Sequence, residues 1–454
     1  MSQKLQFQTL KIYPRPVTGR FNRWRVGFVA VTQLVFFLLP WLMWNGRPAV
    51  RFDFGTMRGY LFDLVLLPQD LIYLAGALIL SALGLFLWTT LAGRLWCGFS
   101  CPQTVYTQIM LWIEQVFEGP QRTRRLRDAG PWTPEKILRK AVSQGAMAVF
   151  ALWTGLTLVG YFSPMRPMVA RLAEGMLGPW ETGFALGYAA FTWLLAGHLR
   201  EAVCKHMCPY ARFQGVMYDR DTLHVTYDPT RGEPRGALRR STPAAARPQG
   251  DCVDCGLCVQ VCPAGIDIRQ GLQYECINCG LCIDACDPVM DKTGRPRGLI
   301  RFSTQNALES GQPPLGWLQR PRALFYSGLM IVCSAVMGVG LYLHAPFKVD
   351  VLRDRAVFAR ENEAGEIENA YTLRIFNTRG EHRHYRVRLE GAPGVRLEGA
   401  GGFQVPADAD GSFVVTVAAQ PETLSSGSHP LRFVVEDAAD PLRTVEAHAP
   451  FLMP

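Results

Sequence analysis

The chain has no cysteine after residue 333, which excludes the paired cysteines of antibody domains from its C-terminal part. No cleavable signal-peptide pattern precedes the first apolar run, and no acid–base pair of side chains is recognisable. Charged residues make up only 19% of the chain, whereas hydrophobic residues make up 49%. Long apolar runs alternate with strongly basic stretches, which is typical of a membrane protein with soluble parts.

The net charge of +9 does not indicate a nucleic-acid-binding protein. The basic residues stand beside the apolar runs, where membrane topology explains them. Five of these runs are long enough to predict transmembrane helices. They cover residues 26–44, 71–92, 141–162, 182–198 and 323–343.

The Lys and Arg content of the loops predicts the orientation of these helices. Residues 1–25 contain six and residues 93–140 contain eight, against three in 45–70 and two in 163–181. By the positive-inside rule, the N-terminal segment, the loop 93–140 and the polar segment after the fourth span are cytoplasmic. Five spans then place the C-terminus outside, so the chain is predicted to lie in the inner membrane of a bacterium with a periplasmic C-terminal domain.

The composition divides the chain into regions of different fold class. Residues 26–227 are predicted to form an α-helical membrane domain, and residues 228–250, rich in Pro, Arg, Gly and Ala, a flexible linker. A cysteine-rich domain follows at 251–322, before the fifth span. Short alternating runs between regularly spaced turns predict a seven-stranded, all-β immunoglobulin-like sandwich at 345–454, as a binding or docking module.

Eight cysteines follow the spacing C-x2-C-x2-C-x3-C twice within residues 252–286. This pattern is typical of bacterial ferredoxins with two [4Fe–4S] clusters, in which the fourth cysteine of each run binds the other cluster. The predicted ligands are Cys252, Cys255, Cys258 and Cys286 for one cluster, and Cys276, Cys279, Cys282 and Cys262 for the other. In the second run Asp287 separates the last cysteine from Pro288, which alters the Cys-Pro turn without removing a ligand.

Zinc and disulfides are the alternatives for these eight cysteines. Zinc sites use two well-separated pairs of ligands, rather than four cysteines within eleven residues, twice. Disulfides are rare in the cytoplasm, where the topology places this segment. The spacing therefore favours two iron–sulfur clusters.

Four further cysteines form two Cys-x3-Cys-Pro motifs, each directly after a predicted span. Cys97 and Cys101 follow the second span, and Cys204 and Cys208 follow the fourth. An amphipathic stretch follows each motif, and after the first it has an apolar face formed by Val105, Ile109, Trp112, Ile113 and Val116. The repeated unit predicts two pseudo-symmetric halves of a four-helix core, with all four thiols near the cytoplasmic interface.

The spacing of these motifs lets each pair act together. On a helix, cysteines four residues apart share a face. Thiolates prefer soft ions such as Cu(I), and a dithiol can also cycle with a disulfide. The alternative is that the pairs only shape helix ends. His206 and Met207, inside the second motif, either add ligands or are packed, and Cys333 is expected to be a small buried hydrophobe.

Several segments resemble the accessory proteins of cbb3-type cytochrome c oxidase, a family of polyferredoxin-like membrane proteins of the CcoG, FixG or RdxA type. The segments are GIDIR at 265–269, GLQYEC at 271–276, CIDACD at 282–287, WCGFSCPQTV at 96–105 and CPYARFQ at 208–214. The resemblance covers almost the whole chain, including the five spans and the sandwich.

The resemblance implies a role in the biogenesis of cbb3-type oxidase, as a cupric reductase that converts Cu(II) to Cu(I). It implies two [4Fe–4S] clusters as cofactors, held by the eight cysteines of 252–286, with copper as substrate or transient ligand. The copper-interacting, catalytic thiols would be Cys97, Cys101, Cys204 and Cys208. Expected partners are oxidase assembly factors, copper chaperones, a cytoplasmic or membrane electron donor and membrane lipid; a homodimer is allowed, and no nucleic acid is expected.

Two other functions remain open on the sequence. Related proteins of nitrate reduction combine four spans, Cys-x3-Cys-Pro motifs and two clusters, so a membrane quinol dehydrogenase is the main alternative. A hydrophobic cleft with bound quinone would favour it, whereas the fifth span and the sandwich favour the accessory protein. The third function is a non-catalytic assembly scaffold, in which the sandwich grips an oxidase or chaperone.

Overall fold

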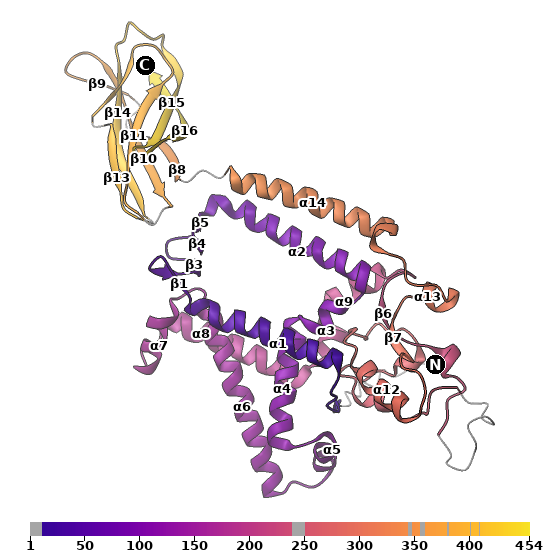
Figure 1. Cartoon of the computed structure of the whole chain (residues 1–454). Helices are drawn as coiled ribbons and strands as arrows, with labels where there is room; N and C mark the ends of the chain where they lie inside the picture. Colours follow the sequence, from indigo (N-terminus) through magenta and orange to yellow (C-terminus); the bar gives the residue numbers. More distant parts are fainter. Residues whose placement is uncertain are drawn as a thin grey trace, which may run out of the picture. The chain divides into compact units, whose positions relative to one another are not determined.

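A computed structural model describes residues 11–237, 250–343, 347–354, 359–378, 381–399, 401–407 and 409–454. The chain forms two compact units. Unit 1 comprises Met1–Leu42, Val50–Phe54 and Asp70–Ala335, and unit 2 comprises Met43–Ala49, Gly55–Gln69 and Val336–Pro454. Unit 1 contains all cysteines of the chain, and unit 2 contains the C-terminal sandwich. Figure 1 shows the helices and strands of the chain coloured by sequence.

Four helices in the described part of the chain are long and apolar enough to cross a membrane. They are α1 (Arg20–Leu38) extended by η1 (Leu39–Trp41), α2 (Leu71–Ala92), α6 (Pro134–Val159) and α14 (Pro321–Tyr342). A helix of the length of α2 reaches about 33 Å, close to the thickness of the apolar core of a bilayer. Thr133 caps α6, because its side chain accepts a hydrogen bond from the backbone N–H of Lys136.

The predicted fourth span, 182–198, is not one continuous α-helix. Helix α8 (Pro179–Thr192) continues as the π-helix η3 (Trp193–Leu199). α8 packs closely on α6, because a Cβ on Gly155 would lie 2.2 Å from the carbonyl oxygen of Ala185. Such close packing through small residues is typical of helix contacts in membranes. A fifth membrane span stays a prediction.

Shorter helices connect the apolar ones. They are α3 (Leu95–Phe99), α4 (Pro102–Glu118), α5 (Gln121–Ala129), α7 (Met165–Ala173), η4 (Val203–Met207) and α9 (Pro209–Met217). α4 differs from the amphipathic helix predicted after the first thiol motif. Met110 and Glu114 are buried on it, whereas Val116 is 75% exposed. The predicted apolar face is met in part: Val105 is buried and Ile113 packs on a buried cluster, whereas the buried side of α4 also includes the charged Glu114.

The cysteine-rich region is built around the antiparallel pair β6 (His224–Tyr227) and β7 (Ile300–Ser303). Its helices are α10 (Pro229–Gly232), α11 (Leu257–Gln260), η6 (Ile268–Gln270), α12 (Leu281–Lys292), α13 (Gln305–Ser310) and η7 (Trp317–Gln319). The predicted linker 228–250 begins with ordered residues, because the Asp228 side chain caps α10. Residues 238–249 of that linker, and residues 1–10 of the N-terminal segment, lie outside the described residues.

Short strands occupy the loop predicted between the first two spans. They are β1 (Met43–Trp44), β2 (Arg47–Pro48), β3 (Val50–Asp53), β4 (Arg58–Leu61) and β5 (Leu64–Leu66), followed by η2 (Pro68–Asp70). β1 pairs with β2 and β4 with β5, both antiparallel. The sequence analysis treated this segment as a loop and did not predict these strands.

The C-terminal region folds as two facing antiparallel sheets, as the alternating pattern predicts. Its strands are β8 (Phe347–Arg353), β9 (Arg360–Glu361), β10 (Ile367–Asn377), β11 (Arg383–Glu390), β12 (Val395–Glu398), β13 (Gly402–Val405), β14 (Asp410–Ala419), β15 (Gly427–Asp437) and β16 (Asp440–Met453). One sheet has the order β12-β14-β10-β8 with β9 on β10, and the other β13-β11-β15-β16. The described residues thus form nine strands rather than seven, around a core that includes Tyr371, Phe433 and Phe451.

Candidate iron–sulfur and thiol site

The eight cysteines of 252–286 surround two neighbouring pockets. The first is lined by Cys252, Cys255, Cys258 and Cys286. The second is lined by Cys262, Cys276, Cys279 and Cys282, with Cys258 at its wall. The pockets therefore group the cysteines as the ferredoxin spacing predicts, with one cysteine of each run at the pocket of the other run.

Helix α12 explains this exchange of cysteines. Cys282 and Cys286 lie about one helical turn apart on α12, and Cys282 lines the second pocket while Cys286 lines the first. Gly280, just before α12, adopts the left-handed conformation with φ of 72°, which is readily available to glycine. Pro288 lies inside α12, so the altered Cys-Asp-Pro segment continues this helix.

The residues around each pocket fit a [4Fe–4S] cluster. Each pocket offers four thiols among apolar side chains such as Leu299 and Ile268, and four cysteine thiolates are the ligand set of such clusters. Within the described residues, no three His, Cys, Asp or Glu side chains meet closely enough to hold a single metal ion. Each cysteine of a [4Fe–4S] cluster binds a different iron, so its sulfurs surround the cluster instead of meeting at one ion. The eight ligand assignments stay predictions that the two pockets support.

The first Cys-x3-Cys-Pro motif lies in α3 and at the start of α4. Cys97 is within α3, and Cys101 immediately precedes Pro102. The Cys97 Sγ lies 3.6 Å from Oε1 of Gln214, and the same oxygen accepts a 2.7 Å hydrogen bond from Nε of Arg94. Arg94 and Gln214 are both buried. Because Gln214 belongs to α9, the first motif is anchored to the helix that follows the second motif.

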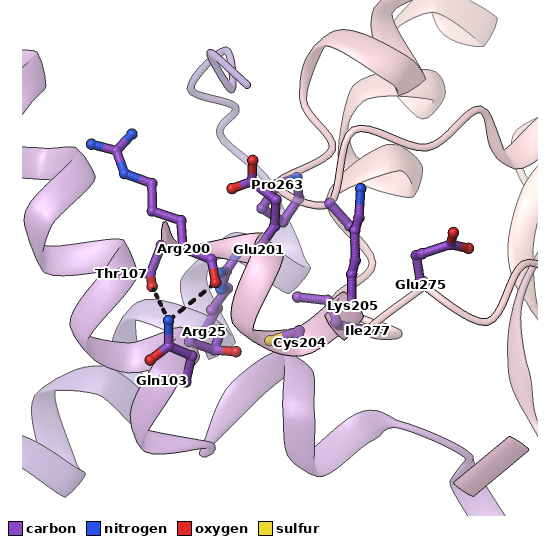
Figure 2. A pocket seen from close by; sticks show the side chains of 12 residues that line it. Arg25, Gln103, Thr107, Arg200, Glu201, Cys204, Lys205, Pro263, Glu275 and Ile277 are labelled. Atoms are coloured by element: carbon purple, nitrogen blue, oxygen red, sulfur yellow. Dashed lines mark hydrogen bonds between the residues drawn. The ribbon is translucent and has the colours of Figure 1, made fainter. Parts of the chain in front are cut away.

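The second motif lines an open pocket (Figure 2). Cys204 lies in η4, and Cys208 immediately precedes α9. Figure 2 shows the pocket walls, which combine residues from five segments: Arg25, Gln103, Thr107, Arg200, Glu201, Cys204, Lys205, Pro263, Glu275 and Ile277. The pocket therefore extends from the second motif to the loops that carry Cys262 and Cys276.

The four thiols of the two motifs lie near enough for their charges to interact, although in the described part of the chain no three of them meet closely enough to hold one metal ion. Burial raises the pKa of Cys97 to about 12, and the charges of Cys101 and Cys204 add to this increase. Burial likewise raises the pKa of Cys204 to about 11, with contributions from Cys101 and Cys208. The guanidinium of Arg94 opposes the increase at both thiols. The two motifs, which are more than a hundred residues apart in sequence, thus form one thiol site.

A buried ion cluster holds the two motifs in place. Glu114 on α4 binds Arg124 of α5 at 2.7 Å and also binds Arg200, which precedes the second motif. Lys11 approaches the same carboxylate at 3.4 Å. Burial acts to raise the pKa of Glu114, but these cations outweigh it and hold the pKa below its usual value. Removing one partner would leave a buried charge uncompensated.

The first motif packs directly on the loop that carries Cys276 and Cys279. A Cβ on Gly98 would lie 2.5 Å from the carbonyl oxygen of Ile277 and 3.1 Å from the Cα of Cys279, so a larger residue does not fit. The side-chain amide of Asn278 donates a 3.2 Å hydrogen bond to the carbonyl oxygen of Ala92. The thiol site and the second cysteine pocket are therefore in contact through the backbone.

Arg25 is a site residue that the sequence did not single out. It is 2% exposed, lines the pocket of Figure 2 and lies close enough to Cys262 and Cys279 for their charges to interact. Its Nε has no hydrogen-bond partner in the described part of the chain. The available signal was an arginine directly before the first apolar run. Arg94, Gln214 and Asn278 were also missed, because no spacing pattern marks a buried polar residue that contacts a distant motif.

Other residues considered in the sequence lie outside this site. His206 and Met207 are exposed, Met207 by 60%, so neither is packed. Cys333 is half-buried on α14 and lines none of the pockets described above. The expectation that it is a buried hydrophobe is therefore only partly met.

Three protein-family models match the chain. The 4Fe-4S dicluster domain matches residues 199–305, which contain the second thiol motif and both cysteine runs. A 4Fe-4S binding domain matches residues 74–120, which contain the first thiol motif. The immunoglobulin-like fold found at the C-terminus of FixG, described as a putative oxidoreductase, matches residues 337–454.

Curated relatives match almost the whole chain. Protein RdxA of Cereibacter sphaeroides is 37% identical over 97% of this chain and 96% of its own length. The nitrogen fixation protein FixG of Rhizobium meliloti is 35% identical over 91% of this chain and 85% of its own length. A solved FixG-related protein from Vibrio parahaemolyticus is 27% identical, with a TM-score of 0.22, and covers 24% of this chain and 97% of its own. The chain therefore belongs to the FixG/RdxA family of membrane-associated iron–sulfur electron-transfer proteins.

Proposed function

We propose that the protein is a membrane-bound cupric reductase that converts Cu(II) to Cu(I) for the assembly of cbb3-type cytochrome c oxidase. The copper site consists of Cys97, Cys101, Cys204 and Cys208. The observation that carries this proposal is the contact of the joined thiol site with the loop of Cys276 and Cys279, made through Gly98. A thiol site that only shaped helix ends would not need that contact.

The chemistry requires one electron for each copper ion. When bound, the two [4Fe–4S] clusters supply electrons singly, over a range of potentials set by their surroundings. Soft thiolates bind Cu(I) in preference to harder ions, so the four sulfurs favour the reduced product. The electron transfer itself moves no proton, whereas the thiols, whose pKa burial raises, release their protons to water when they bind copper.

The residues around the thiols have separate tasks in this proposal. The Arg94 guanidinium balances the negative charge that develops when the thiols bind copper, and it is held in place by Gln214. The pocket of Figure 2 gives copper access to Cys204, past the carboxylates of Glu201 and Glu275. The buried pair of Glu114 and Arg200 keeps the two motifs at a constant separation.

The proposal includes an orientation and partners. The basic N-terminal segment and the loop 93–140 place the thiols and clusters on the cytoplasmic side. The sandwich then lies in the periplasm, where it docks oxidase assembly factors or copper chaperones. Deleting the sandwich would, on this proposal, impair oxidase assembly in cells and leave copper reduction by the purified protein intact.

Anaerobic stopped-flow absorbance tests the central step. The full-length protein, reduced with dithionite and freed from excess reductant, is mixed with Cu(II), and cluster oxidation is followed together with Cu(I) capture by bathocuproine. The wild type is compared with a variant in which Cys97, Cys101, Cys204 and Cys208 are serine. Cys333→Ser is the matched control, because Cys333 is a cysteine of unit 1 outside the site.

We expect fast cluster oxidation with matching Cu(I) formation in the wild type and in Cys333→Ser, and its loss in the fourfold variant. If the fourfold variant reacts as fast, copper meets the clusters directly and the role of the thiols is wrong. If no variant reacts with Cu(II), the protein is not a cupric reductase.

A further inference from the structure

A large apolar cavity is lined by residues of α1, α2 and α3, and Gln214 is not among them. It has a volume of about 1030 Å³ and is lined by side chains that include Phe21, Phe28, Trp88, Trp96, Phe99 and Ser100. Ligand pockets usually measure about 300–1,000 Å³. The cavity therefore has room for a ring system and part of a long apolar tail.

The lining of the cavity is mostly aromatic and aliphatic and includes a few polar side chains. The rings of Phe28 and Phe99 meet edge to face at 6.0 Å, and those of Phe21 and Phe302 lie 5.3 Å apart. Flat aromatic ligands pack well on such walls. Arg20 and Ser100 add hydrogen-bonding groups to the lining. Together these groups suit a ligand with a planar polar ring and an apolar tail.

The cavity adjoins both redox centres of the proposed function. Trp96, Phe99 and Ser100 come from the segment that carries Cys97 and precedes Cys101. The Phe21 ring, also in the lining, lies against Gly280, where an added Cβ would come within 2.6 Å of it. Gly280 follows Cys279 directly. A position beside both redox centres suits a ligand that donates electrons, whereas a phospholipid has no redox chemistry.

We propose that this cavity binds a membrane quinol, which is the electron donor of the protein. The destination of its electrons rests on the proposed cupric reductase function. Oxidation of one quinol to quinone releases two electrons and two protons; the electrons reduce two Cu(II) ions to two Cu(I) ions, and the protons pass to water. This donor is drawn from the membrane in which the apolar helices are predicted to lie.

Gly84 offers a way to fill the cavity. It lies on α2 in the cavity lining, and a Cβ there would meet no heavy atom within 4 Å. Gly84→Phe therefore occupies the cavity without disturbing the backbone. Gly145→Phe is the matched control, because Gly145 is also a helical glycine with no heavy atom within 4 Å of its Cβ, but on α6 and away from the cavity.

The test uses full-length protein in phospholipid nanodiscs with two probes. An azido-ubiquinone is photo-crosslinked, with unlabelled decylubiquinol or extra phospholipid as competitor, and the labelled peptides are mapped. Separately, the protein is reduced under anaerobic conditions either with decylubiquinol or with dithionite that is then removed; cluster reduction is measured first, and Cu(I) formation after Cu(II) is added. Cluster reduction by quinol reports on the donor alone, and Cu(I) formation with dithionite reports on the copper step alone.

We expect labelling of α1, α2 or α3 that decylubiquinol removes, and at least a tenfold loss of labelling and of quinol-driven cluster reduction in Gly84→Phe. Gly145→Phe should match the wild type, and dithionite-driven Cu(I) formation should be equal in all three proteins. Labelling removed equally by phospholipid, or unchanged in Gly84→Phe, would show a lipid cavity and overturn the proposal. Failure of Cu(I) formation with dithionite would refute the reductase but leave the quinol site standing on cluster reduction.

Discussion

The two Cys-x3-Cys-Pro motifs have the same spacing but different surroundings. The first is closed on the side of the second cysteine pocket: Gly98 is buried against the backbone of Ile277, and Cys97 contacts the buried Gln214. The second is open: Cys204 lines the pocket of Figure 2, with Lys205 beside it. The residue that corresponds to Gly98 in the second motif is Lys205. Its long side chain could not take the place of Gly98, where even a Cβ would clash with the carbonyl oxygen of Ile277.

This difference divides the work of the joined thiol site. The closed motif faces the second cysteine pocket, so it is suited to receiving electrons across a fixed contact. The open motif faces solvent through its pocket, so it is suited to admitting copper. The predictions below test this division, ordered by their expected effect on the rate of Cu(II) reduction.

The largest effect is expected when one pair of thiols is removed. Either Cys97→Ser with Cys101→Ser, or Cys204→Ser with Cys208→Ser, should slow Cu(II) reduction about 100-fold, equivalent to about 2.7 kcal/mol in the barrier. Only the first pair should also change the electron paramagnetic resonance spectrum of the reduced clusters, because Cys97 packs near Cys279 and Cys282. Equal spectral changes from both pairs would remove the distinction between a closed and an open motif.

A smaller loss is expected from closing the space at Gly98. Gly98→Ala places a Cβ against the carbonyl oxygen of Ile277, so the contact must open, at a cost of about 1–3 kcal/mol in the free energy of unfolding. We expect about a tenfold slower reduction, since electron transfer crosses this contact. Gly145→Ala is the control and should leave the rate unchanged. A Gly98→Ala protein that reacts at the wild-type rate would show that the contact is structural only.

Arg25 should affect the rate through the clusters. Its buried positive charge lies near Cys262 and Cys279, and a nearby cation stabilises the reduced, more negative cluster. Arg25→Gln should lower the midpoint potential of one cluster by about 60 mV, a tenfold change in a one-electron equilibrium, and Arg25→Lys should restore most of it. A redox titration followed by electron paramagnetic resonance measures this. Unchanged potentials in Arg25→Gln would limit Arg25 to packing.

No effect on the rate is expected from the core of the sandwich. Phe433 is fully buried there, and Phe433→Ala should lower the unfolding free energy of the sandwich by about 3–5 kcal/mol. Copper reduction and the cluster spectra of the purified protein should match the wild type, because all the cysteines lie in unit 1. Loss of copper reduction in this variant would show that the sandwich takes part in the reaction.

The sequence was sufficient where the chemistry is encoded in local spacing. The ferredoxin spacing predicted which cysteines share a pocket, and the alternation of 345–454 predicted two packed sheets. It was insufficient where distant segments meet. Nothing local marks Arg94 as the cation beside the thiols, or Glu114 as a buried carboxylate, because each is stabilised by a partner far away in the chain. The amphipathic face predicted on α4 was met only in part, with Val105 buried but Val116 exposed.

The π-helix after α8 also escaped prediction. The run of apolar residues at 182–198 predicts a span from hydropathy alone. Hydropathy does not distinguish an α-helix from a π-helix, whose number of residues per turn differs. The π-helix ends at Leu199, directly before Arg200 and the second thiol motif. Local irregularity of this kind often occurs at functional sites.

The most direct test of the account is to measure the iron and copper contents, together with the copper X-ray absorption spectrum, of anaerobically prepared protein loaded with one equivalent of copper. The account predicts two clusters' worth of iron in both the wild type and the variant lacking Cys97, Cys101, Cys204 and Cys208, with Cu(I) bound only by sulfur in the wild type and lost from the variant. Iron that falls by one cluster in the variant would show that the four thiols hold iron instead. If the copper spectrum were the same in both proteins, copper would bind outside the four thiols. Either this result or the loss of iron would contradict the joined thiol site as the place where copper is reduced.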